Sequence, residues 1–361
     1  MSNVFVGLSG GVDSSVSAAL LQEQGHEVVG AFIEAWQPEG FPCSQEQDRI
    51  DAMRVAAELA IPFELVDAKE AYRAKVAQYM IDAYRRGETP NPDVMCNREV
   101  KFGVLYEYAM QNGAEYLATG HYAQKHHMQN SKLQHEYALL MGADREKDQS
   151  YFLWTLTQEK LAHTLFPIGH LTKSEVRTKA AALGLSTARK KDSQGLCFLG
   201  KLDMRDFLAH YIPPREGVVL NTNGDKIGTH DGAWFYTPGQ RHGFRIKTHG
   251  TQTTPHYVIE KNIEHNTITV STDPRYNTRT RKLSRVVITD TNWIRKIPNV
   301  GSTYEARLRY RQPLFDVTIE SCNDTQATVL LHSLQPVPIG QSLVLYDGDA
   351  CMGGGILTSS Q

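Results

Sequence analysis

Apolar and polar positions alternate with two different periods along the first half of the chain. Short apolar runs at residues 3–8, 26–33 and 62–67 have the length and residue types of buried strands. Stretches with helical spacing are found at 16–24, 48–59, 71–86, 102–111 and 177–185, and a further short strand is expected at 116–119. This alternation predicts a parallel sheet with helices on both faces, in which ligands bind beyond the carboxyl ends of the strands.

The pattern changes near residue 210, where two prolines and a series of glycines separate short β-like pieces. From about residue 280 only strand-like segments remain, at 285–289, 302–311, 314–320, 327–331 and 342–346. Short strands without intervening helices predict a small antiparallel barrel. We therefore expect a Rossmann-like α/β domain at 1–205, a small, mainly β central domain at 206–278 and a C-terminal β-barrel at 279–361.

Composition narrows the class of protein. The 361 residues are 41% hydrophobic and 22% charged, with a net charge of −2, as in an ordinary globular protein. No apolar run is long enough to span a membrane, and the N-terminus lacks the pattern of a signal peptide. Five cysteines at irregular spacing argue against a disulfide framework. We expect a cytoplasmic protein without membrane contact.

A local basic region could still bind a polyanion. Ten Lys and Arg residues lie between Arg275 and Arg311, against only two acidic residues. Strand periodicity over 304–311 would place Arg307, Arg309 and Arg311 on one face. That face could meet phosphates, or it could be an ordinary solvated strand.

The segment Ser9–Ser15, Ser-Gly-Gly-Val-Asp-Ser-Ser, lies between the first strand and the first helix. Glycines let an anion approach the backbone, and the free amides of the helix start stabilise it. The chain has no G-x-x-x-x-G-K-[ST] here, so no lysine is expected on the β/γ-phosphates, and no G-x-G-x-x-G for a dinucleotide. The motif resembles the PP-loop of ATP pyrophosphatases, which implies that ATP is split to AMP and pyrophosphate. An ordinary Gly-Gly turn is the alternative.

Two cysteines stand out by their surroundings. Cys96 follows a polar segment in which two prolines oppose regular structure, and Cys197 follows the basic run 189–191 in another loop. A nearby positive charge lowers the pKa of a thiol and favours the reactive thiolate. A reactive role and a role as a small buried hydrophobe both remain open for these two. Cys43, Cys322 and Cys351 are interpreted as structural.

The whole chain resembles the tRNA-specific 2-thiouridylases, PP-loop enzymes with a Rossmann-like adenine-nucleotide alpha hydrolase domain. The matching motifs, in order, are residues 7–14, 91–97 with Lys101 and Phe102, 118–122, 147–152, 191–198, 232–241, 309–311, 340–341 and 351–355. The chain departs from the family pattern at Ile33-Glu34, where a methionine and a lysine are expected. The role assigned to Ile33 is through its backbone, so ATP binding should survive.

The resemblance implies roles for individual residues. Cys197 would carry sulfur as a persulfide, Cys96 would be its partner nucleophile, and Asp93 would be a general acid/base. ATP would be bound by Gly7, Leu8, Ser9, Gly10, Gly11, Val12, Asp13, Ser14, Ile33 and Gly120. The target base would contact Asn91, Pro92 and Asp93, and tRNA would contact His121, Lys147, Asp148, Gln149, Arg309, Tyr310 and Gln341.

The implied activity is ATP-dependent 2-thiolation of the wobble uridine (position 34) of tRNA. ATP with Mg²⁺ would be the cosubstrate, and the tRNAs for Lys, Glu and Gln the expected substrates. Sulfur would come from a cysteine desulfurase or a relay of carrier proteins. His121, His126 and His127 keep no ligand spacing with a carboxylate or cysteine, so no protein-bound metal is expected.

Two other classes of protein share part of the pattern. Small-molecule ligases such as argininosuccinate synthase, and amidotransferase synthetases, use the same loop but need no cysteine pair. A non-catalytic RNA-binding or nucleotide-sensing protein would need the basic region but not the paired thiols. The two cysteines therefore favour the sulfurtransferase.

Overall fold

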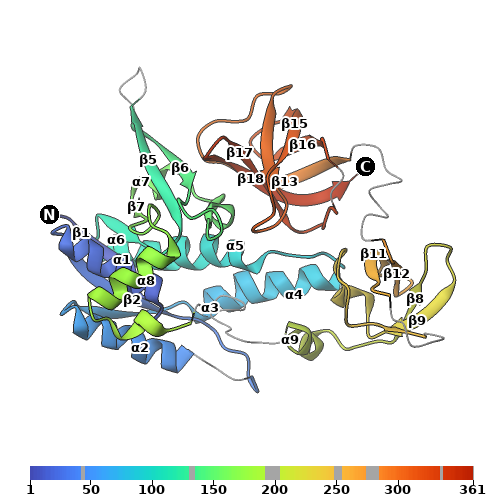
Figure 1. The fold of residues 1–361 in the computed structure, drawn as a ribbon, viewed down its shortest axis with the longest axis horizontal. Coiled ribbons are helices and arrows are strands. Elements are labelled where there is room, and N and C mark those ends of the chain that lie inside the picture. The colour runs from blue at the N-terminus through green and yellow to red at the C-terminus, as the bar shows by residue number, and fades with distance from the viewer. Residues whose placement is uncertain are drawn as a thin grey trace.

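The computed structural model describes residues 1–41, 45–129, 135–191, 204–247, 254–273, 284–333 and 336–360. Figure 1 shows three regions, with the α/β domain at the N-terminus, a small β domain beyond one end of α4, and a barrel at the C-terminus. Across the described residues, no helix is both long enough and apolar enough to cross a bilayer.

The N-terminal domain is built on a parallel sheet, as its strand–helix alternation predicts. The sheet has the order β3-β2-β1-β4-β7, and all its strand pairs are parallel. Its strands are β1 (Asn3–Gly7), β2 (Glu27–Glu34), β3 (Phe63–Asp67), β4 (Tyr116–Ala118) and β7 (Thr164–Leu165). The α-helices are α1 (Val12–Glu23), α2 (Gln45–Glu58), α3 (Lys69–Tyr72), α4 (Gln78–Arg85), α5 (Pro92–Cys96), α6 (Tyr106–Gln111), α7 (Gln158–Ala162) and α8 (Lys173–Ala182).

Helices cover both faces of this sheet because the buried strands are apolar on both sides. Val4 and Val6 of β1 pack in one cluster with residues of α1 and α2, whereas Phe5 packs in another with residues of α3, α5 and α6. The expected Rossmann-like α/β fold is confirmed.

The helix that carries Cys96 differs from the expectation. Pro92 opens α5, because the first position of a helix needs no amide donor, and the Asn91 side chain caps it by accepting a bond from Val94 N at 3.3 Å. A π-helical segment (Asn97–Leu105) joins α5 to α6, and another (Arg73–Ala77) joins α3 to α4. The prediction that Cys96 lies in a polar loop is therefore wrong, since it ends a buried helix.

The central domain is a small sheet with the order β10-β9-β8-β12-β11. Its strands are β8 (Gly217–Leu220), β9 (Lys226–His230), β10 (Arg245–Ile246), β11 (Tyr257–Asn262) and β12 (Thr267–Ser271). Helix α9 (Met204–Tyr211) precedes it and packs Phe207 and Leu208 against Met80 and Ile81 of α4. This packing ties the central region to the N-terminal domain.

The C-terminal region is the expected antiparallel barrel. Its strands are β13 (Arg285–Trp293), β14 (Thr303–Arg307), β15 (Phe315–Cys322), β16 (Gln326–Leu331), β17 (Ser342–Asp347) and β18 (Ala350–Ser360). They follow the order β13-β16-β15-β14-β17-β18, and the pairing of β13 with β18 closes the barrel. The hairpin of β5 (Ala123–Gln129) and β6 (His135–Met141) belongs to the N-terminal domain, and β6 pairs with β18.

Two features of the barrel differ from the sequence prediction. Strand β14 ends at Arg307, and the chain turns at 309–311, where Arg311 has a φ of 61°. The predicted strand face of three arginines is therefore wrong. Strand β18 lies outside the segments predicted as strands, and a Cβ at Gly353 or Gly354 would lie 2.0 Å from Asn292 O or 2.3 Å from Leu343 O. Only glycine lets this strand fit so closely between its neighbours.

Candidate functional site

The loop between β1 and α1 has the geometry of an anion site. Gly10 has a φ of +68°, and a Cβ there would lie 2.3 Å from Asp48 O, while a Cβ at Gly120 would lie 2.8 Å from Ser14 N. The loop is thus packed closely between α2 and the end of β4. Because the N-cap residue of α1 is Gly11, no side chain of that residue occupies the amides of the first helical turn.

The predicted ATP-binding residues gather here. Gly7, Leu8, Ser9, Gly10, Gly11, Val12, Asp13 and Ser14 run continuously from the end of β1 into α1, Gly120 follows β4, and Ile33 lies near the end of β2, all at the carboxyl edge of adjacent strands. Ser9 N donates to Ser14 Oγ at 3.1 Å, which holds the loop closed. ATP binding by these residues stays a prediction.

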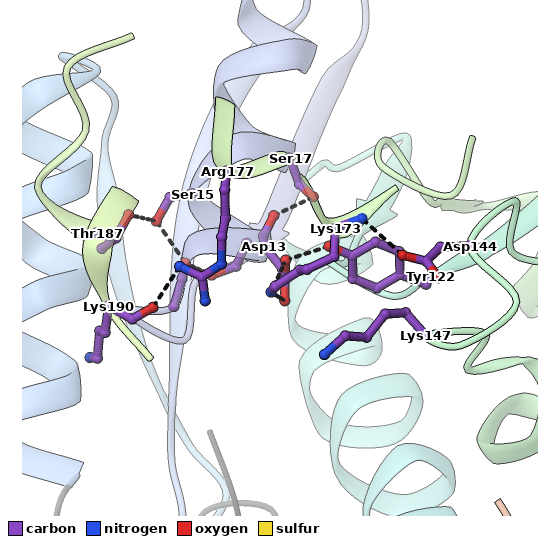
Figure 2. A network of polar contacts seen from close by, with 12 residues as sticks. Asp13, Ser15, Ser17, Tyr122, Asp144, Lys147, Lys173, Arg177, Thr187 and Lys190 are labelled. Atoms are coloured by element: carbon purple, nitrogen blue, oxygen red, sulfur yellow. Dashed lines mark hydrogen bonds and ion pairs between the residues drawn. The ribbon is translucent and has the colours of Figure 1, made fainter. Parts of the chain in front are cut away.

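The structure adds a lysine that the motif lacks. Lys173, the first residue of α8, places Nζ 2.7 and 2.8 Å from the two carboxylate oxygens of Asp13, and the Tyr122 hydroxyl donates to Asp13 at 2.8 Å (Figure 2). Lys147 extends toward the same region in this view. Sequence reasoning missed Lys173 and Tyr122. Tyr122 lies in the matched motif 118–122, whereas Lys173 is 160 residues from Asp13 along the chain and lies in no matched motif.

The segment that leads to Cys197 is attached to this loop. Thr187 Oγ1 donates to Ser15 Oγ at 3.0 Å, and Arg177 Nη1 donates to the carbonyls of Ala188 and Lys190 at 3.2 and 3.0 Å (Figure 2). Cys197 itself, like Cys43, lies outside the described residues.

Lys190 fixes the end of this segment. Its Nζ lies 2.9 Å from Asp48 and 2.6 Å from Asp51, both on α2. Burial works against charge on each partner, but their mutual hydrogen bonds outweigh it, so the pKa of Lys190 is raised and the pKa of Asp51 is lowered. The segment before Cys197 is therefore held by a charged pair that persists across the neutral pH range.

A second site forms where the N-terminal domain meets the barrel. A cavity of about 400 Å³ is lined by Tyr84, Thr89, Pro90, Asn91, Pro92, Asp93, Phe152, Met204, Arg309, Tyr310 and Gln341. Gln341 Nε2 donates to Pro90 O at 2.9 Å, and Asn91 Nδ2 donates to Gln341 Oε1 at 3.3 Å. The three residues predicted to contact the target base thus meet three of those predicted to contact tRNA.

Aromatic and cationic groups line the wall of this cavity. The rings of Phe152 and Tyr310 lie 4.6 Å apart at 43°. Arg309 Nη2 donates to Pro238 O of the central domain at 2.9 Å, and burial lowers the pKa of its guanidinium. Sequence reasoning missed Tyr84, Thr89, Pro90, Phe152 and Met204; of these, only Phe152 lay in a matched motif, next to the residues assigned to tRNA.

Cys96 lies on the helix that brings Asp93 to the cavity wall. Asp93 and Cys96 are three residues apart on α5 and so lie on the same side of the helix, with Asp93 at the cavity wall and Cys96 fully buried. The thiol is within one helical turn of the predicted acid/base. Its burial means that the surrounding residues must move before it can react with a partner sulfur.

The remaining residues assigned to tRNA lie outside this cavity. His121 is buried, with Nδ1 2.8 Å from Thr119 Oγ1 and Nε2 3.4 Å from Lys101 Nζ. Asp148 is 1% exposed and accepts bonds from the backbone N–H of Gly142 and of Ser150. We expect His121 and Asp148 to act on the shape of the site. Gln149 Oε1 accepts from Tyr122 N, which ties this loop to Asp13.

Several arginines of the basic region at residues 275–311 form ion pairs with acidic side chains. Of its described members, Arg285 pairs with Glu320, Arg295 with Glu136 and Arg307 with Asp148, at 2.7, 2.9 and 2.9 Å. Arg309 and Arg311 are the basic residues of the 309–311 turn, and Arg311 stacks on the Tyr310 ring at 5.1 Å. Of the described members of the basic region, Arg309 lines the cavity, and it does so from a turn rather than from a strand.

Glu34, which stands where the family pattern has a lysine, has cationic neighbours. Its carboxylate lies 3.2 Å from Lys69 Nζ and 3.9 Å from Arg49 Nη1. The side chain of residue 34 is therefore part of a surface charge cluster.

Among the described residues, no group of three or more His, Cys, Asp or Glu side chains has the arrangement of a metal site.

Family models match almost the whole chain. They are the tRNA methyl transferase HUP domain at residues 2–201, the tRNA methyl transferase PRC-barrel domain at 205–272 and the Aminomethyltransferase beta-barrel domain at 283–357. Among solved structures, the chain gives a partial match to the U34-tRNA thiolase NcsA from Methanococcus maripaludis, with a TM-score of 0.36 and 19% identity over 58% of this chain and 64% of that chain.

Relatives of similar length have a higher sequence identity to this chain than the solved structure has. The chain is 42% identical to tRNA-specific 2-thiouridylase MnmA of Geobacillus thermodenitrificans, over 98% of this chain and 94% of the relative. It is 43% identical to the protein of the same name from Shouchella clausii, over 98% and 96%. With this identity across all three regions, the chain belongs to the tRNA-specific 2-thiouridylase family.

Proposed function

We propose that this protein is an ATP-dependent sulfurtransferase that replaces the C2 oxygen of the wobble uridine of tRNA with sulfur. The observation that carries this proposal is the cavity between domains, where Asn91, Pro92 and Asp93 meet Arg309, Tyr310 and Gln341 one turn from Cys96. A polar pocket with an aromatic and cationic wall suits a base that has left the anticodon stack. Membership of the 2-thiouridylase family supports this substrate.

ATP would activate the base. The C2 oxygen of uridine is a poor leaving group, and transfer of AMP to this oxygen makes AMP the group that departs. The amides of the β1–α1 loop would stabilise the pyrophosphate that is released. Mg²⁺ would accompany ATP, whose phosphate oxygens would be ligands of the ion.

Sulfur transfer would follow in two steps. The terminal sulfur of a Cys197 persulfide attacks C2 and displaces AMP, leaving a C2–S–S–Cys197 linkage. The Cys96 thiolate then attacks the Cys197 sulfur, which releases 2-thiouridine and forms a Cys96–Cys197 disulfide. A two-electron reductant reopens the disulfide, and a cysteine desulfurase or carrier protein reloads Cys197. Asp93 is the proposed proton-transfer group, and the tRNAs for Lys, Glu and Gln are the proposed substrates.

Reconstitution tests the proposal. Purified protein is incubated with ATP, Mg²⁺, a persulfide donor and unmodified tRNA, and 2-thiouridine is measured by mass spectrometry of digested tRNA. We expect one AMP for each thiolated uridine. Absence of 2-thiouridine with the wild-type protein contradicts the proposal.

The assignment of Cys197 has its own test. Cys197→Ser should abolish 2-thiouridine formation while tRNA-dependent release of pyrophosphate from ATP persists, because adenylation precedes the sulfur step. Cys322→Ser, on the barrel, is the matched control and should retain thiolation. Loss of pyrophosphate release in Cys197→Ser alone would show that the residue acts earlier than assigned.

A further inference from the structure

The β1–α1 loop carries a negative charge, which would repel the phosphates of ATP. Residues 9–15 include no cation, and the side chain of Asp13 adds a negative charge beside the helix start. Backbone amides alone must then offset both this carboxylate and several phosphate charges. A phosphate site of this kind needs a positive group from elsewhere in the chain.

Lys173 is held in place to supply that charge. It is the first residue of α8, where Thr172 caps the helix and Lys173 N donates to Asp144 Oδ2 at 2.9 Å. Helices α1 and α8 pack in one apolar cluster through Val12, Val16, Val176 and Ala180. The position of the ammonium relative to the loop is therefore set by buried helix packing rather than by a mobile side chain alone.

The contacts of the neighbouring cations distinguish Lys173. Arg177 donates to two carbonyls of the segment before Cys197, and Lys190 is held between Asp48 and Asp51. The carboxylate partner of Lys173 belongs to the loop itself, and the lysine side chain is only 13% exposed. Asp13 also accepts a hydrogen bond from Tyr122 and so keeps a donor if the ammonium turns to another anion (Figure 2).

We propose that Lys173 binds the pyrophosphate portion of ATP and that Asp13 competes with the phosphates for its ammonium. This inference rests on the proposed use of ATP and adds a phosphate-binding residue to it. Phosphate oxygens carry more charge than one carboxylate, so they draw the ammonium from Asp13 with little movement of the backbone. The competing possibility is that Lys173 only neutralises Asp13.

Binding of inorganic pyrophosphate, measured by calorimetry without divalent cations, distinguishes a phosphate-binding Lys173 from one that only neutralises Asp13. Lys173→Met should raise the Kd at least tenfold, and Asp13→Asn should lower it severalfold, because repulsion is removed and the ammonium is released. The double variant Asp13→Asn/Lys173→Met removes both charges and leaves neither unpaired. It should bind at least tenfold more weakly than Asp13→Asn alone. Lys179→Met, in the last turn of α8, is the matched control and should bind as the wild type does.

The proposal is overturned if Lys173→Met changes pyrophosphate affinity by less than twofold in the Asp13→Asn background, since Lys173 would then act only on Asp13. It is equally overturned if the wild type does not bind pyrophosphate, or if Lys173→Met weakens AMP binding as much as pyrophosphate binding. Neither tRNA nor sulfur enters the experiment. Its failure is therefore distinct from a failure of thiolation.

Discussion

At the scale of single residues, burial decides what several motif residues do. The contact of His121 with tRNA stays a prediction, and in the structure its side chain is buried between Thr119 and Lys101. Burial, and then the charge of Lys101, hold its pKa well below 6.5, so the ring is neutral at pH 7. A protonated Lys101 donates to Nε2, which leaves the ring proton on Nδ1, facing Thr119. The imidazole thus orients Lys101 near the end of β4.

This protonation state predicts a pH effect on stability. Below pH 6.5 the unfolded chain binds a proton at His121 that the folded chain does not, so the free energy of unfolding falls as the pH falls. The contribution of one such histidine is at most about 1.4 kcal/mol per pH unit. We expect His121→Asn to lose less stability than the wild type between pH 6.5 and 5 in urea titrations. Parallel curves for the two proteins would contradict the buried neutral state.

At the scale of elements, the ends of helices and strands carry the chemistry. The Asn91 cap and Pro92 turn a proline-rich segment into a helix that presents Asp93 to the cavity and buries Cys96. Helix α1 starts directly after Gly10 and Gly11, which place its first amides toward the loop. For α5 the local sequence predicts an interruption, and the structure uses it as a helix start. For α1 the sequence predicts the helix start itself, and the structure places it at Val12.

The close approach at Gly10 can be tested by adding one methyl group. Gly10→Ala introduces a residue with positive φ and places a Cβ against Asp48 O, so α2 or the loop must shift. We expect a loss of several degrees in Tm and weaker pyrophosphate binding. Gly25→Ala is the control, because Gly25 also has a positive φ but open space around it, and it should cost only about 1 kcal/mol. Equal effects of the two substitutions would contradict close packing on the loop.

At the scale of the whole molecule, a continuous sheet and a buried ion pair join the N-terminal domain to the barrel. Strand β6 pairs with β18, and Asp148 meets Arg307 across the junction with side chains 0% and 9% exposed. Arg307 also lies over the Tyr346 ring at 5.4 Å. Because Arg309 and Tyr310 follow directly in the chain, this pair sets where the cavity wall stands relative to α5.

Breaking the Asp148–Arg307 pair should lower the free energy of unfolding substantially. Asp148→Asn leaves the Arg307 charge buried without a partner of opposite charge, which costs about 3–5 kcal/mol. The double variant Asp148→Asn/Arg307→Met should recover part of this loss. Denaturation can be followed by fluorescence of Trp154, which donates to Ser342 Oγ at the same junction. Arg295→Met removes a more exposed pair with Glu136 and should cost about 1 kcal/mol or less. A similarly small loss in Asp148→Asn would show that the pair is dispensable.

The amino-acid sequence by itself determined the strand–helix alternation, the anion loop, the strand-only C-terminal region and the residues with chemical potential. These depend on local periodicity and on turn residues, whose energetics extend over a few positions. Only the tertiary structure decided that Lys173 meets Asp13, that Gln341 meets Asn91, that Arg307 is buried, and that glycine-rich β18 closes the barrel. Those outcomes depend on packing between segments far apart in the chain, because close approach and burial arise only when the domains are assembled.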